Sequence, residues 1–509
     1  MTQQNPKFLR YLLPSISALL WMITFVGVLV NGPKMINGDG DLGRHITVGN
    51  YILSNHVIPL TDVFSHTMTG EPLTPHEWLS EVLFALAHRI MGLDGAILLA
   101  AVVIAMSFWL TFRRSSRGRK SYFVLIITTL LILLTSSIHW LSRPHIFTFL
   151  MLALWLMVLE DLVEGKTGRW VWLPVIMLFW VNLHGAFIAG FATWALYAAG
   201  LIWDRVWFKT SIDTPLPAGF WRAFLLGGGI SLLVTLINPA GTGIWSTSVG
   251  YVANRFLVDH TVEYMAPDFH NPDLIPFLIF IAVLILSLGL KRKKVRAEWL
   301  IPSTAWLIMA LYSQRNIPLF VIVAAPLLAE SLEEIFFAYA EKSKFISACL
   351  QRDRNLFTLN TSLQGGVLLV LVVFLSIIGL RAGMKFDQKQ LGNTYDPEKF
   401  PVAAVDWLET HPQDGEMFNY FIWGGYLLYR EWPDLQVFID GQTDFYGETL
   451  SREYLSVLAL DPEWEEILTR RHVDWVILPV EELAARTLIQ SPDWTVVYKD
   501  STTVIVHRD

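Results

Sequence analysis

The chain has 509 residues, of which 53% are hydrophobic and 16% charged, and its formal net charge is -7. Soluble domains carry about a quarter of their residues as charged ones, so this composition indicates a multi-pass membrane protein with a soluble part attached. The mildly acidic balance excludes the basic surface that nucleic-acid binding needs. The single cysteine, Cys349, excludes an intrachain disulfide and a thiolate metal cluster.

About eleven apolar runs are long enough, or nearly so, to cross a bilayer. They lie at roughly 11–31, 95–112, 121–138, 145–159, 170–183, 186–204, 223–238, 273–290, 299–313, 316–331 and 366–382. Basic clusters at 113–120 and 291–294 are expected in the cytoplasm by the positive-inside rule, and Lys7 and Arg10 agree with a cytoplasmic N-terminus. The sequence therefore predicts a polytopic α-helical protein of the plasma membrane whose C-terminus lies outside.

One segment decides on which side the first loop lies. Trp78–Ile90 is apolar along one helical face and carries Glu77, Glu81 and His88 on the other. Because it is short and charged along one side, we interpret it as an interfacial helix at about 77–90 on the outer leaflet, and expect a second one at about 42–53. A crossing helix here would instead move both basic clusters outside.

After residue 382 charged residues become frequent and apolar residues alternate with polar ones. Predicted strands lie at 416–420, 435–440, 473–480, 494–500 and 502–509, and predicted helices at 401–411, 449–460 and 463–471. Strands that alternate with helices indicate a small α/β domain, here ending in a hairpin at Asp500–Ser501. We therefore expect a transmembrane domain at 1–382, with its first extracytoplasmic loop at 34–94, and an extracytoplasmic α/β domain at 383–509.

The first loop is long and rich in titratable side chains for a connector. It opens with Gly-Asp-Gly-Asp-Leu-Gly-Arg-His, and Asp41 and His45 lie one turn apart if a helix follows. A carboxylate beside an imidazole can deprotonate a hydroxyl, or can bind a divalent cation such as Mg²⁺ or Mn²⁺ together with Asp39. The alternatives are that Asp41 caps a helix and that Asp39 is a solvated turn residue. Arg44 and Glu77 are further site candidates in this loop.

Polar residues at the ends of later spans fall on one side of the membrane by the span count: Arg143, His184, Glu263 and Arg315. A charge at bilayer depth costs about 2.5–3.5 kcal/mol on insertion scales, so cations gathered near one face indicate an anionic ligand such as a lipid phosphate. Taken singly, the two arginines could snorkel to headgroups and His184 could cap a helix. In the tail, FIDGQTD at 438–444 places two aspartates at the end of a strand, and turn chemistry is the favoured interpretation.

With these motifs the chain resembles the GT-C superfamily of membrane glycosyltransferases, which includes protein mannosyltransferases, aminoarabinose transferases and oligosaccharyltransferase catalytic subunits. The resemblance is one of plan: a first span, a long outside loop with an early acidic motif, many spans and a soluble outside domain. The family's first-loop acid matches Asp41, and residues 73–92 look like its juxtamembrane helix. The chain is also similar to prokaryotic membrane proteins with D-x-x-x-H in the first loop and G-G-Y…D-G in the tail. Two motifs depart: Asp39-Gly40-Asp41 replaces the mannosyltransferase-type Asp-Glu pair, and the tail lacks the oligosaccharyltransferase Trp-Trp-Asp.

The resemblance implies that a sugar moves from a polyprenyl-phosphate donor to an extracytoplasmic acceptor, with inversion at the anomeric carbon. Asp41 would be the general base with His45 orienting it, and Arg143 and Arg315, with His184, would hold the phosphate charge. One rival interpretation is a transporter or lipid flippase, which would place polar groups near mid-span. Another is a non-catalytic membrane scaffold that binds a partner through its tail.

Overall fold

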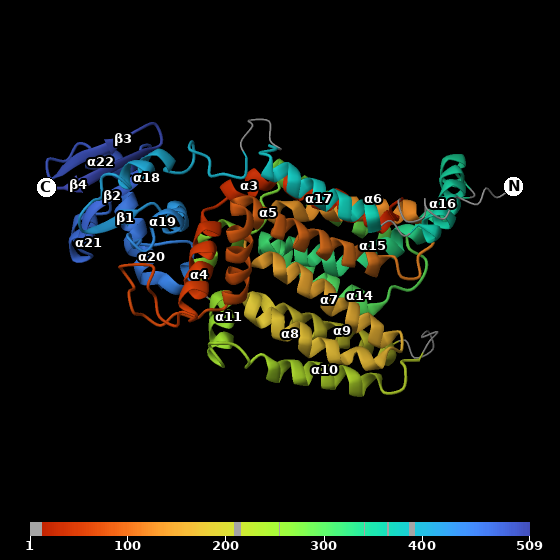
Figure 1. Cartoon of the computed structure of the whole chain (residues 1–509). Helices are drawn as coiled ribbons and strands as arrows, with labels where there is room; N and C mark the ends of the chain where they lie inside the picture. Colours follow the sequence, from red (N-terminus) through yellow and green to blue (C-terminus); the bar gives the residue numbers. More distant parts are fainter. Residues whose placement is uncertain (1–12, 208–214, 254, 341, 364–365, 386–391) are drawn as a thin grey trace.

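The computed structural model describes residues 13–207, 215–253, 255–340, 342–363, 366–385 and 392–509, so Lys7 and Arg10 lie outside the described residues. A bundle of helices carries a small α/β domain at one end, and the helix α16 (Lys344–Ser362) lies at the other end (Figure 1). The prediction of a mostly helical protein with a small C-terminal sheet is confirmed.

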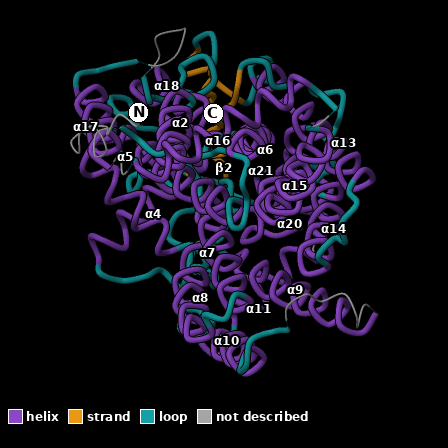
Figure 2. Tube along the Cα trace, turned by 90° about the vertical axis from the view of Figure 1, so that its right-hand side faces the viewer, coloured by secondary structure: helices purple, strands orange, loops and turns teal. Residues whose placement is uncertain are grey.

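Each of the predicted apolar runs forms a helix. These are α2 (Ile16–Val30), α5 (Trp78–Ser115), α6 (Tyr122–Ser136), α7 (His145–Val163), α8 (Trp172–Leu183), α9 (Ile188–Trp207), α10 (Phe220–Val234), α13 (Ile275–Leu290), α14 (Ala297–Tyr312), α15 (Ile317–Tyr339) and α17 (Gly366–Arg381). Among the described residues, five helical stretches are long and apolar enough to cross a bilayer, so the number of spans stays a prediction. Figure 2 shows α8, α9 and α10 together on the side of the bundle away from α17.

The interfacial segment and the following span form one element, α5, that is broken in the middle. Met91 (φ -142°) and Gly92 (φ 61°, ψ -150°) leave the helical conformation, and glycine adopts the second of these conformations without steric cost. Before the break, Phe84 and Ala85 are buried, whereas Leu86 and Ile90 are 41% and 69% exposed. The segment is therefore amphipathic as expected, and its position in the outer leaflet stays a prediction.

A buried arginine joins three helices at the end of the bundle away from the α/β domain. Arg114 of α5 donates from Nε to Glu160 of α7 (2.6 Å) and from its two terminal nitrogens to the carbonyls of Ile322 (2.7 Å) and Val323 (3.2 Å) in α15. Pro326 lacks an N–H group, so the Ile322 carbonyl has no helical donor four residues on. Arg114 supplies that missing donor, which ties α5 and α7 to the point where proline interrupts α15.

The C-terminal domain holds a four-stranded sheet with the order β1-β2-β4-β3. The strands are β1 (Glu416–Asn419), β2 (Val473–Pro479), β3 (Trp494–Lys499) and β4 (Thr503–Arg508). Its helices are α18 (Val402–Leu408), α19 (Gly424–Glu431), α20 (Thr443–Ala459), α21 (Trp464–Arg470) and α22 (Leu483–Leu488). β1 and β2 run parallel, and β3 and β4 form the predicted antiparallel hairpin.

The strand predicted at 435–440 is wrong, because this segment is not part of the sheet. Its backbone instead pairs with the first loop: the Val437 N–H donates to the Phe64 carbonyl, and the His66 N–H donates to the Val437 carbonyl, both at 3.1 Å. Val437, Phe438 and Ile439 are all buried, because the segment lies between the first loop and the rest of the domain. The extended, apolar pattern at 435–440 therefore indicates a buried segment and not a strand of the sheet.

The sheet links the tail to the bundle through the alternation of side chains along its strands. Trp475 and Ile477 of β2 belong to the same hydrophobic core as the bundle helices. Val476 and Leu478, on the opposite face, belong to a second core formed within the tail. The α/β domain and the bundle thus share a continuous core.

The Arg114 contacts generate a stability prediction. Replacing Arg114 with leucine leaves Glu160 buried without its nearest partner, and breaking a buried pair from one side costs about 3–5 kcal/mol. We expect R114L to lower the melting temperature of the detergent-purified protein by several degrees. The control is R113L, which removes the same charge from an exposed side chain lying 5.0 Å over the Trp109 ring. Equal melting temperatures for the two variants would contradict the role of Arg114.

Candidate active site

The first loop meets the tail where α4 (Asp41–Asn55) packs against α19. The backbones approach too closely for side chains: a Cβ on Gly43 would meet the Gly425 carbonyl oxygen at 2.3 Å. A Cβ on Gly425 would in turn meet the Gly40 carbonyl oxygen at 2.3 Å. Glycine is required at such close approaches, so GDGDLGRH and the Gly-Gly pair of the tail form one contact. Figure 1 shows α4 between the bundle and the α/β domain.

Three carboxylates converge on one guanidinium group. Arg143 lies between the short 3-10 helix η1 (Ser137–His139) and α7. Its Nε is 2.8 Å from Asp39 Oδ2, its Nη2 is 3.0 Å from Asp41 Oδ2, and its Nη1 is 2.7 Å from Glu263 Oε1. All four side chains are between 16% and 26% exposed. The structure therefore brings Arg143 and Glu263 to the predicted first-loop acids, and none of the four side chains is fully buried.

Local contacts of Asp39 and Asp41 bear on the alternative roles that the sequence suggests for them. The Asp41 N–H donates to Asp39 Oδ1 at 3.0 Å, so Asp39 makes the turn that precedes α4. Asp41 is the first residue of α4, where a carboxylate is favoured by the helix dipole. The N-cap of α4 is Gly40 and no side chain caps it, so Asp41 does not cap the helix.

Burial and neighbouring charges give the carboxyl groups of Asp39 and Glu263 different pKa values. Burial raises the pKa of Asp39 to about 6, and the opposing effect of Arg143 is too small to reverse it. Burial also raises the pKa of Glu263, but the Arg143 and Arg315 charges outweigh it and hold the pKa at about 2. At neutral pH these two groups are therefore ionised, and Asp39 is the one that takes up a proton just below neutrality.

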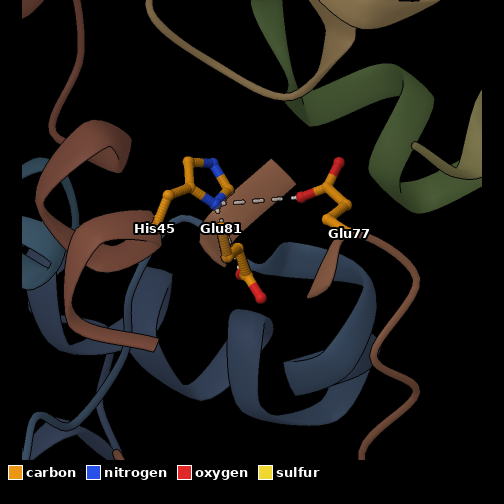
Figure 3. A group of neighbouring side chains, drawn as sticks. All are labelled: His45, Glu77 and Glu81. Carbon is orange, nitrogen blue, oxygen red and sulfur yellow. Dashed lines mark hydrogen bonds and ion pairs between the residues drawn. The ribbon is translucent and has the colours of Figure 1, made fainter. Parts of the chain in front are cut away.

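A second cluster surrounds Glu77, the residue before α5. His45 Nδ1 lies 3.4 Å from Glu81 Oε1 and 3.9 Å from Glu77 Oε2 (Figure 3). Glu77 Oε1 lies 3.4 Å from His184 Nε2 and 3.9 Å from His76 Nε2. Burial lowers the pKa of His76, but Glu77 and Asp444 outweigh that effect and the net pKa is raised. One carboxylate is thus ringed by three imidazoles from different parts of the chain.

The orientation of the His184 ring is fixed by hydrogen bonds at its Nδ1 atom. Its Nδ1 is 2.8 Å from Thr148 Oγ1, and that hydroxyl accepts a hydrogen bond from Trp180 Nε1 at 3.0 Å. The Ala186 N–H also points to His184 Nδ1 at 3.4 Å, which is the capping contact that the sequence left open. These bonds at one ring nitrogen direct the other, Nε2, toward Glu77.

The residues that fit a divalent cation are those of the second cluster. The ligand atoms of His45, Glu77 and Glu81 all lie within 4.8 Å of one another. A mixed imidazole and carboxylate set suits Zn²⁺ or Mn²⁺ better than Mg²⁺, which prefers oxygen ligands. Asp39 and Asp41, the ligands considered from the sequence, both pair with the Arg143 guanidinium.

Other predicted residues lie nearby. Arg315, in the 3-10 helix η6 (Gln314–Asn316), holds its guanidinium 4.5 Å from the ring centre of Tyr264, next to Glu263. Arg44 is buried and pairs with Glu81 at 3.3 Å and with Asp440 at 3.2 Å. Arg315 therefore borders the acidic cluster, which consists of Asp39, Asp41 and Glu263. Arg44 borders the Glu77 cluster.

Sequence reasoning left Glu81, His76 and Asp440 out of the site. Asp440 does make the expected turn bond, since its Oδ1 accepts from the Gln442 N–H at 2.8 Å, but its other oxygen meets Arg44. The available signal was the pairing of Gly-Gly and Asp-Gly in the tail with a glycine-rich first loop. That signal shows that a backbone is closely approached, but it does not name the partner.

The Glu77 cluster generates a metal-binding prediction. We expect Zn²⁺ or Mn²⁺ to raise the melting temperature of the purified protein, because a ligand at 100 times its dissociation constant stabilises by about 2.7 kcal/mol. The shift should disappear in E77Q and persist in D39N. The reverse pattern, loss in D39N and retention in E77Q, would move the metal to the aspartate pair, and no shift in the wild type would contradict both sites.

No protein-family model matches the chain, and no curated protein matches it in sequence. Solved structures do match. The apo oligosaccharyltransferase of Archaeoglobus fulgidus is 12% identical with a TM-score of 0.55, and the match covers 92% of this chain and 69% of that one. The same enzyme tethered with an acceptor peptide containing the NVT sequon gives 12%, 0.56, 91% and 69%. ArnT from Cupriavidus metallidurans bound to undecaprenyl phosphate is 14% identical with a TM-score of 0.50, and the match covers 96% and 97%. Likeness at this level of identity concerns the fold alone, and this chain shares the overall fold of these solved structures.

Proposed function

We propose that this protein is a polytopic membrane glycosyltransferase that moves a sugar from a polyprenyl-phosphate donor to an acceptor outside the cytoplasm. The observation that carries the proposal is the contact of Asp41 with Arg143, a candidate base beside a candidate phosphate-binding cation. The fold supports it, because one similar protein is bound to undecaprenyl phosphate and another to an acceptor peptide.

In the proposed reaction, an acceptor oxygen attacks the anomeric carbon of the donor sugar. The bond from that carbon to the phosphate oxygen breaks, and the phosphate leaves with the electron pair. The acceptor proton passes to the Asp41 carboxylate, and direct displacement inverts the anomeric centre. A phosphate leaves readily once its charge is held, so most of the catalysis lies in positioning and electrostatics.

The donor phosphate would be held by Arg315 and Arg143. Arg143 already pairs with three carboxylates, so we propose that the phosphate exchanges with Glu263, whose carboxylate carries the same sign of charge. Arg315 lies beside the ring of Tyr264, the next residue, and is within reach of the same exchange. Charge-assisted bonds from guanidinium to phosphate are among the stronger polar contacts in proteins.

The roles of the two histidines shift with their contacts. His45 faces Glu77 and Glu81, so we propose that it orients this cluster and not Asp41 directly. His184 faces Glu77 as well, and joins the same cluster. A divalent cation held by His45, Glu77 and Glu81 would supply positive charge that stabilises a leaving phosphate.

The rival class, a transporter or flippase, has less support. It predicts polar groups near mid-span and paired broken helices. The charged groups described above lie at helix ends instead: Arg143 precedes α7, His184 follows α8, and Arg315 precedes α15. That arrangement favours chemistry at one face of the bundle.

The first test concerns the base. We expect D41N to lower turnover by about 10²–10⁴-fold in membranes supplied with a radiolabelled undecaprenyl-phosphate-linked sugar, because a general base contributes about that much. The control is D268N, which changes an exposed aspartate in the segment after Glu263. Wild-type turnover in D41N would remove Asp41 from its role.

The second test concerns the phosphate. Hydrogen bonds to charged groups contribute about 1.5–3 kcal/mol, so R315Q should bind undecaprenyl phosphate about 10-fold to 100-fold more weakly than the wild type. R205Q is the matched control, since Arg205 also lies over an aromatic ring, that of Trp221. If R315Q and R205Q bind the lipid equally well, the phosphate assignment fails.

A further inference from the structure

We infer that the tail loop Asp440–Gln442 positions the first-loop side chains of the active site, so that the α/β domain is a working part of the site and not an appended module. The inference deepens the proposed function and rests on it. Two independent contacts carry it: one reaches Arg44 and the other reaches Asp41.

The first contact is a buried ion pair between the tail and the first loop. Arg44 Nε lies 3.2 Å from Asp440 Oδ2, and the two side chains are only 7% and 2% exposed. Gln442 Oε1 accepts a further hydrogen bond from Arg44 Nη2. The ion pair and the hydrogen bond together hold the Arg44 guanidinium in one orientation. Removing Asp440 would leave the buried charge of Arg44 without this partner.

Arg44 passes that constraint on to the Glu77 cluster. Its Nη1 lies 3.3 Å from Glu81 Oε1, and the same oxygen lies 3.4 Å from His45 Nδ1. Asp440, Arg44 and Glu81 alternate in charge, and His45 follows Glu81 in the same chain of contacts. Without Asp440, the Arg44 guanidinium is free to draw Glu81 away from His45.

The second contact seats the proposed base. A Cβ on Gly441 would lie 1.8 Å from Asp41 Oδ1 and 2.6 Å from its carboxyl carbon. The carboxylate therefore rests directly on the backbone of the tail loop, and its other oxygen meets Arg143 at 3.0 Å. Gly441 on one side and Arg143 on the other define where the Asp41 carboxylate stands.

The two contacts assign Asp440 and Gly441 as positioning residues for different neighbours. A Cβ at Gly441 has to displace the Asp41 carboxylate, because the clash lies far below any normal contact distance. A neutral Asn at position 440 keeps the size of the side chain and removes the charge that holds Arg44. G441A therefore tests the position of the Asp41 carboxylate. D440N tests the relay, the chain of contacts from Asp440 through Arg44 to Glu81.

The experiment uses the full chain in membranes. We expect G441A to lower kcat about 10²-fold, the cost of misplacing a catalytic group by about 1 Å, while affinity for undecaprenyl phosphate and the melting temperature stay within twofold and a few degrees of the wild type. The control is G392A, because a Cβ at Gly392 meets nothing within 4 Å and no positive φ is involved. Wild-type kcat in G441A, or a fall in kcat together with lipid affinity and melting temperature, would overturn the seat.

The relay is tested without substrate. Asp440 and Glu81 both act on Arg44, so the melting-temperature losses of D440N and E81Q should be less than additive in the double variant. Additive losses would overturn the relay. A wild-type chain that transfers no lipid-linked sugar would instead defeat the proposed function, and the melting-temperature cycle would still decide whether the tail loop constrains Glu81.

Discussion

The close approach of α4 to α19 is the constraint on which the rest of the site depends. Three glycines, Gly40, Gly43 and Gly425, let the two backbones meet without intervening side chains. Across this contact Arg44 of α4 reaches Asp440 of the tail. Any side chain at these glycines would separate the helices and move the site residues of the first loop together.

At the end of the bundle next to the α/β domain, the charged groups fix the positions of neighbouring side chains more than they stabilise the fold. A buried ion pair is weak evidence for stability, since well-packed apolar residues of similar volume often stabilise a fold equally well. Arg114, at the opposite end, has a local structural reason, because it supplies a donor that Pro326 removed. Arg44 and Arg143 have no such backbone role among their described contacts; they orient carboxylates of the first loop. Arg143 lies beside Asp41 and Arg44 lies beside Glu81, which agrees with the proposed function.

The helices could be predicted from the sequence because each apolar run is decided by local composition. The tail hairpin was predictable for the same reason. The segment 435–440 was not, since its extended, buried pattern does not say whether it pairs with a sheet or with the first loop. The same limit applies to the site: Asp41 and Arg143 stand out individually, whereas the place of Glu81 depends on Arg44, which is itself held by Asp440, about 400 residues away in the chain. Contacts between distant segments are set by packing, which no local pattern records.

The charge balance of the acidic cluster constrains how a phosphate can enter it. Asp39, Asp41 and Glu263 all pair with Arg143, so in the proposed reaction the donor phosphate enters a site that already holds three carboxyl groups. Their negative charge can fall in two ways. Asp39, with a pKa of about 6, is the carboxyl most easily neutralised by a proton. Glu263, with a pKa of about 2, stays ionised, and in the proposed reaction it moves aside. Glu263 lies in the 3-10 helix η4 (Val262–Tyr264) and does not belong to the contact of α4 with α19, so in the proposed reaction its displacement does not require Asp41 to move. In the proposed reaction, donor entry and the position of the base are thus separable.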